Sequence, residues 1–255
     1  MTEAIGKEIL ENGLTIEWAW CPEVESPREW EDNLGHMLTW SRGCGSPDEN
    51  PWADPVDFVA DMLCERFTLD ELHEAVSAGK LGSLRFEANE HGQERLLAWY
   101  RSMITGRAGW DDVEDYGYYR DKEALARAVA ECPEAPSLLQ EKIVLKTVYR
   151  MEHSRVAYST GSFGDPWDSG AVGFIWADED DVSSWFGGVP TSREKVSKRL
   201  DFEVGRYSQW ADGETYMVAL CDAEGGVIDL VGGYIGDEDL RLGIEDMRGI
   251  ALSAA

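Results

Sequence analysis

Three short segments carry the side chains that could do chemistry in this chain. They contain two histidines, four carboxylate or carboxamide side chains and one serine: Asp32, Asn33, His36, His153, Asp165, Asp168 and Ser169. Histidine and carboxylate groups together can bind a divalent metal or exchange protons near neutral pH. Their spacing matches no HExxH, HxH, DxDxDG or GxSxG motif. An acid–base or metal-dependent hydrolase that uses His153, Asp168 and Asp32 is therefore one hypothesis, and a binding site is the other.

The segment GSFGDPWDSGAVGFIW, residues 161–176, is the most specified part of the chain. Pro166 and Gly170 suit the corners of a tight turn, and the aspartates and the serine between them can bond to nearby amides. Trp167 then either plugs the turn from inside or points outward as a contact. The binding hypothesis gives this turn and the earlier segment its residues: Asp165, Trp167, Asp168, Ser169, Asn33 and His36. The alternative is a rigid structural turn, with both histidines tied into the fold by hydrogen bonds.

The charge of the chain restricts its partners. Fifty acidic residues against 23 basic ones give a net charge of −27, which repels nucleic acid and anionic membranes. We therefore expect no direct binding to nucleic acid or membranes, and a protein partner with a basic surface. Carboxylates gather at residues 23–32, 48–61, 111–115, 178–181 and 237–246. Shared on one face, they would resemble a DNA backbone; spread over all faces, they would serve as caps and solubilising charges.

Other signals are mostly negative. The five cysteines are scattered and form no CxxC pair, which favours free thiols in a cytoplasm. The first residues resemble no signal peptide, and no apolar run is long enough to span a membrane. A P-loop, a dinucleotide fingerprint and basic–aromatic clusters are missing from the sequence, so no cofactor is expected.

Hydrophobic periodicity predicts strands at both ends of the chain and helices between them. The predicted strands are 14–20, 36–40, 141–150, 155–160 and 171–177, followed by a hairpin within 214–236. The predicted helices start after Asp54 and at Thr68, whose partner Glu71 completes a capping box, and others cover 88–106, 121–132 and 191–204. Residues 109–121 are expected to form an exposed loop, and 178–181 an acidic turn.

This order of elements predicts an α+β fold with an antiparallel or mixed sheet. We expect a single domain over residues 1–255, with a helical insertion at about 53–131. The chain contains no repeat of 20 to 50 residues and no long linker.

Segments 26–40, 148–176 and 227–238 resemble an uncharacterised family of phage and mobile-element proteins, which carry DNLG and PWDSGxVGFI(Y/W) segments. The three segments cover about a fifth of the chain. Where that family reads Asp-His-Ser-Gly, this chain has Glu-His-Ser-Arg at 152–155, and residues 50–146 resemble an added insertion. The resemblance implies a phage or mobile-element origin and no particular activity.

Charge and resemblance together favour an acidic accessory protein that binds and inhibits a host protein. DNA mimicry against a DNA-directed defence system would account for the excess of carboxylates. The hydrolase remains the alternative.

Overall fold

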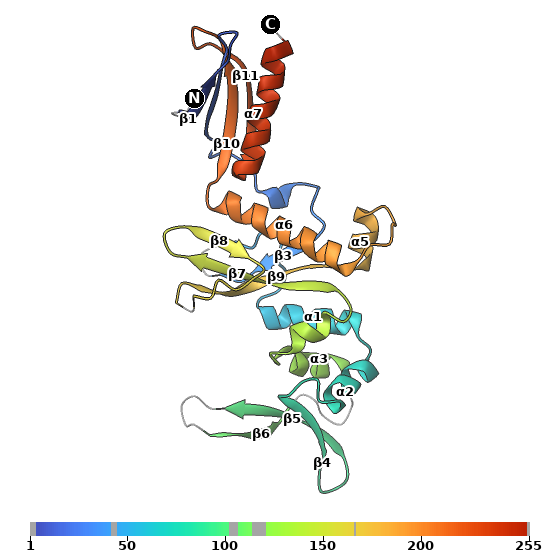
Figure 1. Cartoon of the computed structure of the whole chain (residues 1–255). Helices are drawn as coiled ribbons and strands as arrows, with labels where there is room; N and C mark the ends of the chain where they lie inside the picture. Colours follow the sequence, from blue (N-terminus) through green and yellow to red (C-terminus); the bar gives the residue numbers. More distant parts are fainter. Residues whose placement is uncertain (1–3, 42–44, 102–106, 114–120, 166, 254–255) are drawn as a thin grey trace. The chain divides into compact units, whose positions relative to one another are not determined.

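A computed structural model describes residues 4–41, 45–101, 107–113, 121–165 and 167–253 (Figure 1). Within these residues the predicted α+β class is confirmed, with antiparallel strands in three sheets. The chain divides into two compact units, and each is described by itself. Unit 1 contains residues 1–37, 146–175 and 194–255, and unit 2 contains residues 38–145 and 176–193.

The first sheet of unit 1 joins the two ends of the chain. Its strands, in spatial order, are β1 (Ala4–Ile9), β2 (Thr15–Trp20), β10 (Thr215–Cys221) and β11 (Val227–Ile235). Helix α7 (Gly236–Ser253) covers one face (Figure 1). There Ile16 and Val218 pack with Met247 and Ala251, because alternate strand residues share a face. The predicted hairpin of β10 and β11 is confirmed, whereas β1 and α7 were not predicted.

The second sheet has the order β3 (His36–Thr39), β9 (Ser169–Ala177), β7 (Val144–Glu152) and β8 (Val156–Ser159). Three of these strands continue into the residues of unit 2. Helix α6 (Arg193–Ala211) buries Val196, Leu200, Val204 and Tyr207. Tyr207 contacts Tyr158 of β8 edge to face, with ring centres 5.0 Å apart. The sequence predicted each of these elements.

The described residues of unit 2 form five short helices. They are α1 (Pro55–Arg66), α2 (Leu69–Ser77), α3 (Lys122–Ala130), α4 (Ala135–Leu139) and α5 (Glu179–Trp185). Asp54 caps α1, and the predicted capping box of Thr68 and Glu71 begins α2. The prediction of an acidic turn at residues 178–181 is wrong. Asp178 and Asp181 instead form a second capping box, which begins α5. Helix α4 was not predicted.

The third sheet, of β4 (Leu84–Ala88), β5 (Glu94–Arg101) and β6 (Ala108–Asp112), corrects two predictions. Residues 88–101 do not form the helix predicted over 88–106, and residues 108–112 are a strand rather than part of the loop predicted over 109–121. The remainder of these two predictions, at 102–106 and 114–120, lies outside the described residues. Gly92 has a positive φ of 75°, and the Asn89 side chain accepts hydrogen bonds from the amides of His91 and Gln93. This turn reverses the chain inside the expected helix, so the predicted helical insertion contains a sheet as well.

No helix in the described part of the chain is long and apolar enough to cross a membrane.

Candidate functional site

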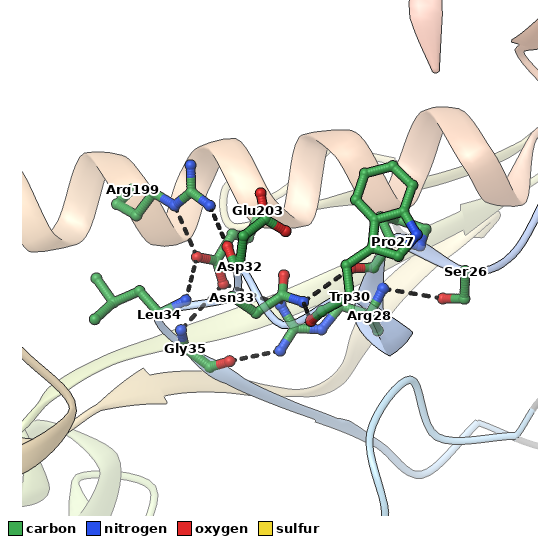
Figure 2. Close-up of polar contacts among 10 residues, drawn as sticks. All are labelled: Ser26, Pro27, Arg28, Trp30, Asp32, Asn33, Leu34, Gly35, Arg199 and Glu203. Carbon is green, nitrogen blue, oxygen red and sulfur yellow. Dashed lines mark hydrogen bonds and ion pairs between the residues drawn. The ribbon is translucent and has the colours of Figure 1, made fainter. Parts of the chain in front are cut away.

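The segment from Ser26 to Gly35 surrounds a buried ion pair (Figure 2). Arg28 and Glu203 of α6 lie 3.0 Å apart, and both side chains are 2% exposed. Arg28 also donates to the carbonyl of Gly35. The Glu203 carboxylate accepts from the amides of Leu34 (2.8 Å) and Gly35 (3.1 Å). Such saturation with hydrogen bonds is what makes a buried pair of charges tolerable.

Asn33 and Asp32 take part in the same network. The Asn33 side chain accepts from Arg28 at 3.0 Å and donates to the carbonyls of Pro27 and Trp30, both at 2.8 Å. Arg199 of α6 donates to the Asp32 backbone carbonyl at 2.6 Å (Figure 2). All three of these hydrogen bonds lie within the segment Ser26–Gly35, so Asn33 stabilises the conformation of that segment.

His36 lies at the start of β3 and is exposed. The two residues before it, Leu34 and Gly35, are bound to α6 through the Glu203 carboxylate, and this fixes where β3 begins.

Within residues 148–176, the chain around Asp165 and Asp168 forms a tight turn before β9. Asp165 accepts hydrogen bonds from the amides of Trp167 (2.9 Å) and Asp168 (3.3 Å), and Ser169 donates to the Asp165 carbonyl. The amide of Glu152 donates to the Asp168 carbonyl at 3.0 Å, which ties the turn to β7. These bonds hold the turn from both sides.

Trp167 points out of this turn and is 92% exposed. Of the two arrangements that the sequence allowed, the structure therefore shows the outward one. An indole held outward on a rigid turn loses little conformational entropy on binding, and tryptophan is enriched among the residues that dominate protein interfaces.

The structure brings His153 and Asp168 together. The Nδ1 atom of His153 and the Oδ2 atom of Asp168 are 3.0 Å apart, but the histidine is 75% exposed. Asp32, the third residue of the hydrolase hypothesis, contacts Arg199 through its backbone carbonyl and not through its carboxylate. Ser169 uses its hydroxyl hydrogen on the Asp165 carbonyl, so it is not poised for activation by His153.

Hydrogen bonds from the Trp167 and Asp168 amides lower the pKa of Asp165, and the nearby His153 lowers it further. Asp165 is thus held as an anion and acts as an acceptor for the turn, not as a general acid. Among the described residues, no group of three or more histidine, cysteine, aspartate or glutamate side chains is placed to hold a metal ion. The Asp165 carboxylate and the Ser169 hydroxyl therefore both serve to hold the turn.

A row of carboxylates runs along one side of α1 in unit 2. Asp54, Asp57, Asp61 and Glu65 follow one another every three or four residues, so the 3.6-residue period places them on one side. Asp57 is half-buried and the other three are exposed. Successive members are about 6 Å apart along the axis, against 3.4 Å per phosphate of one DNA strand.

The start of α3 brings two more carboxylates, Asp121 and Glu123, close to α1, because Lys122 donates to the backbone carbonyl of Cys64. Burial raises the pKa of the Cys64 thiol and the carboxylates of Glu123, Asp61 and Asp121 raise it further, whereas Lys122 lowers it. Arg127 of α3 pairs with Asp57 and supplies a positive charge within the face. We call Asp54, Asp57, Asp61, Glu65, Asp121 and Glu123 the acidic face.

Two residues of the buried network were missed in the sequence, although one signal pointed to them. Glu203 interrupts the apolar side of α6 between Leu200 and Val204, where a charged residue needs a buried partner. Its partner Arg28 is 175 residues away, and no local pattern connects the two.

Comparison of the chain with protein-family models, with curated proteins and with solved structures finds no match.

Proposed function

We propose that this chain is a phage or mobile-element accessory protein that binds a basic, DNA-binding surface of a host protein in the cytoplasm and inhibits it. The acidic face of unit 2 is the observation that carries the proposal. It combines the row of carboxylates on one side of α1 with those that begin α3, and mimicry of DNA requires such a run of negative charge.

Electrostatics determines the class of partner. Acidic residues outnumber basic ones about two to one in each unit, so the chain attracts cationic surfaces from any approach. The acidic face has about half the linear charge of one DNA strand, before Lys122 and Arg127 are subtracted. We therefore expect competition with DNA at moderate salt, and loss of binding at high salt.

Trp167 supplies what charge alone lacks. Long-range attraction speeds association, but a buried aromatic anchor slows dissociation. Trp167 and the acidic face belong to different units, so each is assigned a separate contribution.

The experiment is a pull-down from host lysate at low and high salt, followed by competition with duplex DNA. We expect a DNA-binding protein that is retained at low salt, released at high salt and displaced by the duplex. The variant Asp61→Asn/Glu65→Gln/Glu123→Gln removes three charges from the acidic face and keeps the acceptor that Trp52 uses on residue 61. It should lose the partner.

The matched control is Glu11→Gln/Glu23→Gln/Glu25→Gln, which removes the same charge from exposed positions of unit 1. It should retain the partner. Equal weakening by both variants would show that only net charge matters and would refute the acidic face. Turnover of a small molecule by the purified protein, abolished by His153→Ala, would favour the hydrolase.

A further inference from the structure

Ten of the fifteen large apolar side chains that are exposed in the described residues lie on the first sheet of unit 1 and its helix. They are Ile5, Ile9, Trp20, Val227, Ile228, Leu230, Val231, Leu242, Ile250 and Leu252. Four of them lie in β11, where each is 40 to 54% exposed. Exposed apolar side chains gathered in this way often mark a contact site.

In the described part of the chain, β11 is the last strand of its sheet, after β1, β2 and β10. One of its edges therefore faces no strand. The amide of Leu230 donates to the Asp229 carboxylate at 2.8 Å, as expected of an amide at an open edge. A side chain satisfies a donor that a neighbouring strand would otherwise use.

The register shows what this edge offers on each face. Val231 pairs with Val218, which packs against α7, so Val231 lies on the helix-covered face. Leu230 pairs with Ala219 and lies on the other face. The pairing shifts next to Gly232 and again next to Val227, so the regular edge is four residues long, Asp229–Gly232.

Acidic groups flank the edge at both ends. Asp222 and Glu224 lie in the turn before β11, and Asp237, Glu238 and Asp239 begin the helix after it. In an antiparallel pair of two β11 strands, the turn of each copy would lie beside the acidic helix start of the other. Like charges would then face each other at both ends, which disfavours a second copy as the occupant.

We propose that β11 accepts a short extended segment of a partner protein by strand addition, and that this segment alternates apolar side chains between basic ends. Main-chain hydrogen bonds to the edge at Leu230 supply affinity, and Leu230 and Val231 contact alternate side chains on the two faces. The basic ends pair with the acidic turn and the acidic helix start. This site is distinct from the acidic face and does not depend on it.

The probe is the synthetic peptide KRTVSVTVRK, labelled with a fluorophore and measured by anisotropy. We expect saturable binding, and slower hydrogen exchange at the amides of residues 228–232 when the peptide is present. KRTVPVPVRK has the same charge but cannot extend a sheet, and EETVSVTVEE has the wrong charge, so neither should bind.

Leu230→Pro removes the edge amide and should weaken peptide binding about tenfold or more. Leu230→Lys keeps the backbone and adds a repelling charge, so it tests the same prediction if the proline variant does not fold. Leu252→Lys, on the exposed side of α7, is the matched control and should bind as wild type. The variant Asp61→Asn/Glu65→Gln/Glu123→Gln should also bind as wild type, which separates this site from the proposed function.

Four results would overturn the inference: no binding of KRTVSVTVRK, equal binding of KRTVPVPVRK, binding that survives both Leu230 variants, or a dimer in sedimentation that Leu230→Lys dissociates. The last result would assign the edge to a second copy.

Discussion

The two segments that stand out in the sequence, Ser26–Gly35 and Asp165–Ser169, use their polar residues in opposite ways. The first turns Arg28 inward, where it meets Glu203 out of solvent. The second turns its polar groups onto its own backbone and exposes Trp167. Similar residue types thus form a buried ion pair in one place and an exposed turn in the other. Burial distinguishes the two cases, and residue type does not.

The largest effect on stability should come from breaking the buried ion pair of Arg28 and Glu203. Glu203→Ala leaves Arg28 buried without its charge partner, and two backbone amides lose their acceptor. We expect the free energy of unfolding to fall by about 3 to 5 kcal/mol, measured by urea denaturation. The control is Glu194→Ala, which breaks the exposed pair with Lys198 and should change little. If the free energy of unfolding fell as little for Glu203→Ala as for the control, the proposed importance of the buried ion pair would be contradicted.

The exposed turn should show the reverse behaviour. Trp167→Ala should leave the unfolding midpoint unchanged and weaken binding to the recovered host partner by about 2 kcal/mol or more, because interface tryptophans often dominate affinity. Titration calorimetry with that partner measures the change. Trp99→Ala is the control, because Trp99 is also exposed but packs against Trp110 in unit 2. It should cost stability and not affinity; an unchanged affinity for Trp167→Ala would remove the turn from the interface.

A smaller effect should follow from loosening the turn without removing its tryptophan. Asp165→Ala deprives the Trp167 and Asp168 amides of their acceptor, so we expect weaker partner binding than wild type but stronger binding than Trp167→Ala. Asp165→Asn keeps an acceptor and should bind nearly as wild type. The lowered pKa of Asp165 predicts that the turn holds at neutral pH and loosens only as the pH falls through that pKa. Affinity for Asp165→Ala equal to wild type would show that the turn needs no such support.

Contacts between near neighbours in the sequence were predictable. The cap at Asp54, the capping box of Thr68 and Glu71 and the turn at Asp165 all follow from short-range hydrogen-bonding rules, and the structure contains each of them. The outward direction of Trp167 did not follow, because a turn of this type can present its side chain to either side.

Contacts between distant residues were not predictable. Arg28 and Glu203 come together only when the N-terminal segment lies on α6. The helical period of Leu96, Leu97 and Tyr100 predicts a helix where the structure has the strand Glu94–Arg101, although the turn at Gly92 makes a hairpin possible. For the candidate site, the pairing of His153 with Asp168 was expected as part of a larger group, and the contact of Asp32 with Arg199 was not.

The carboxylate of Glu71 makes a local contact with Thr68 and a distant one with Lys142. Its loss gives the smallest of the predicted effects on stability. The hydrogen bond from Lys142 and the backbone hydrogen bond from Thr68 together lower its pKa from 4.5 to about 2. The stabilisation is therefore complete above the ordinary pKa and is lost as the pH falls from about 4.5 through about 2. Because Glu71 is exposed, solvent keeps the effect on stability small.

Lys142→Met removes the distant contact and keeps the local one. It should raise the pKa of Glu71 but not fully to 4.5, since the Thr68 amide still donates to the carboxylate. The acid loss of stability from this group should still begin near pH 4.5, but it should be smaller than in wild type and complete at a higher pH. Carbon NMR of the Glu71 carboxyl group during an acid titration measures both proteins directly, and Lys80→Met, which breaks the exposed pair with Glu141, is the control. An unchanged Glu71 titration in Lys142→Met would show that the capping box alone lowers the pKa, and that the local contact outweighs the distant one.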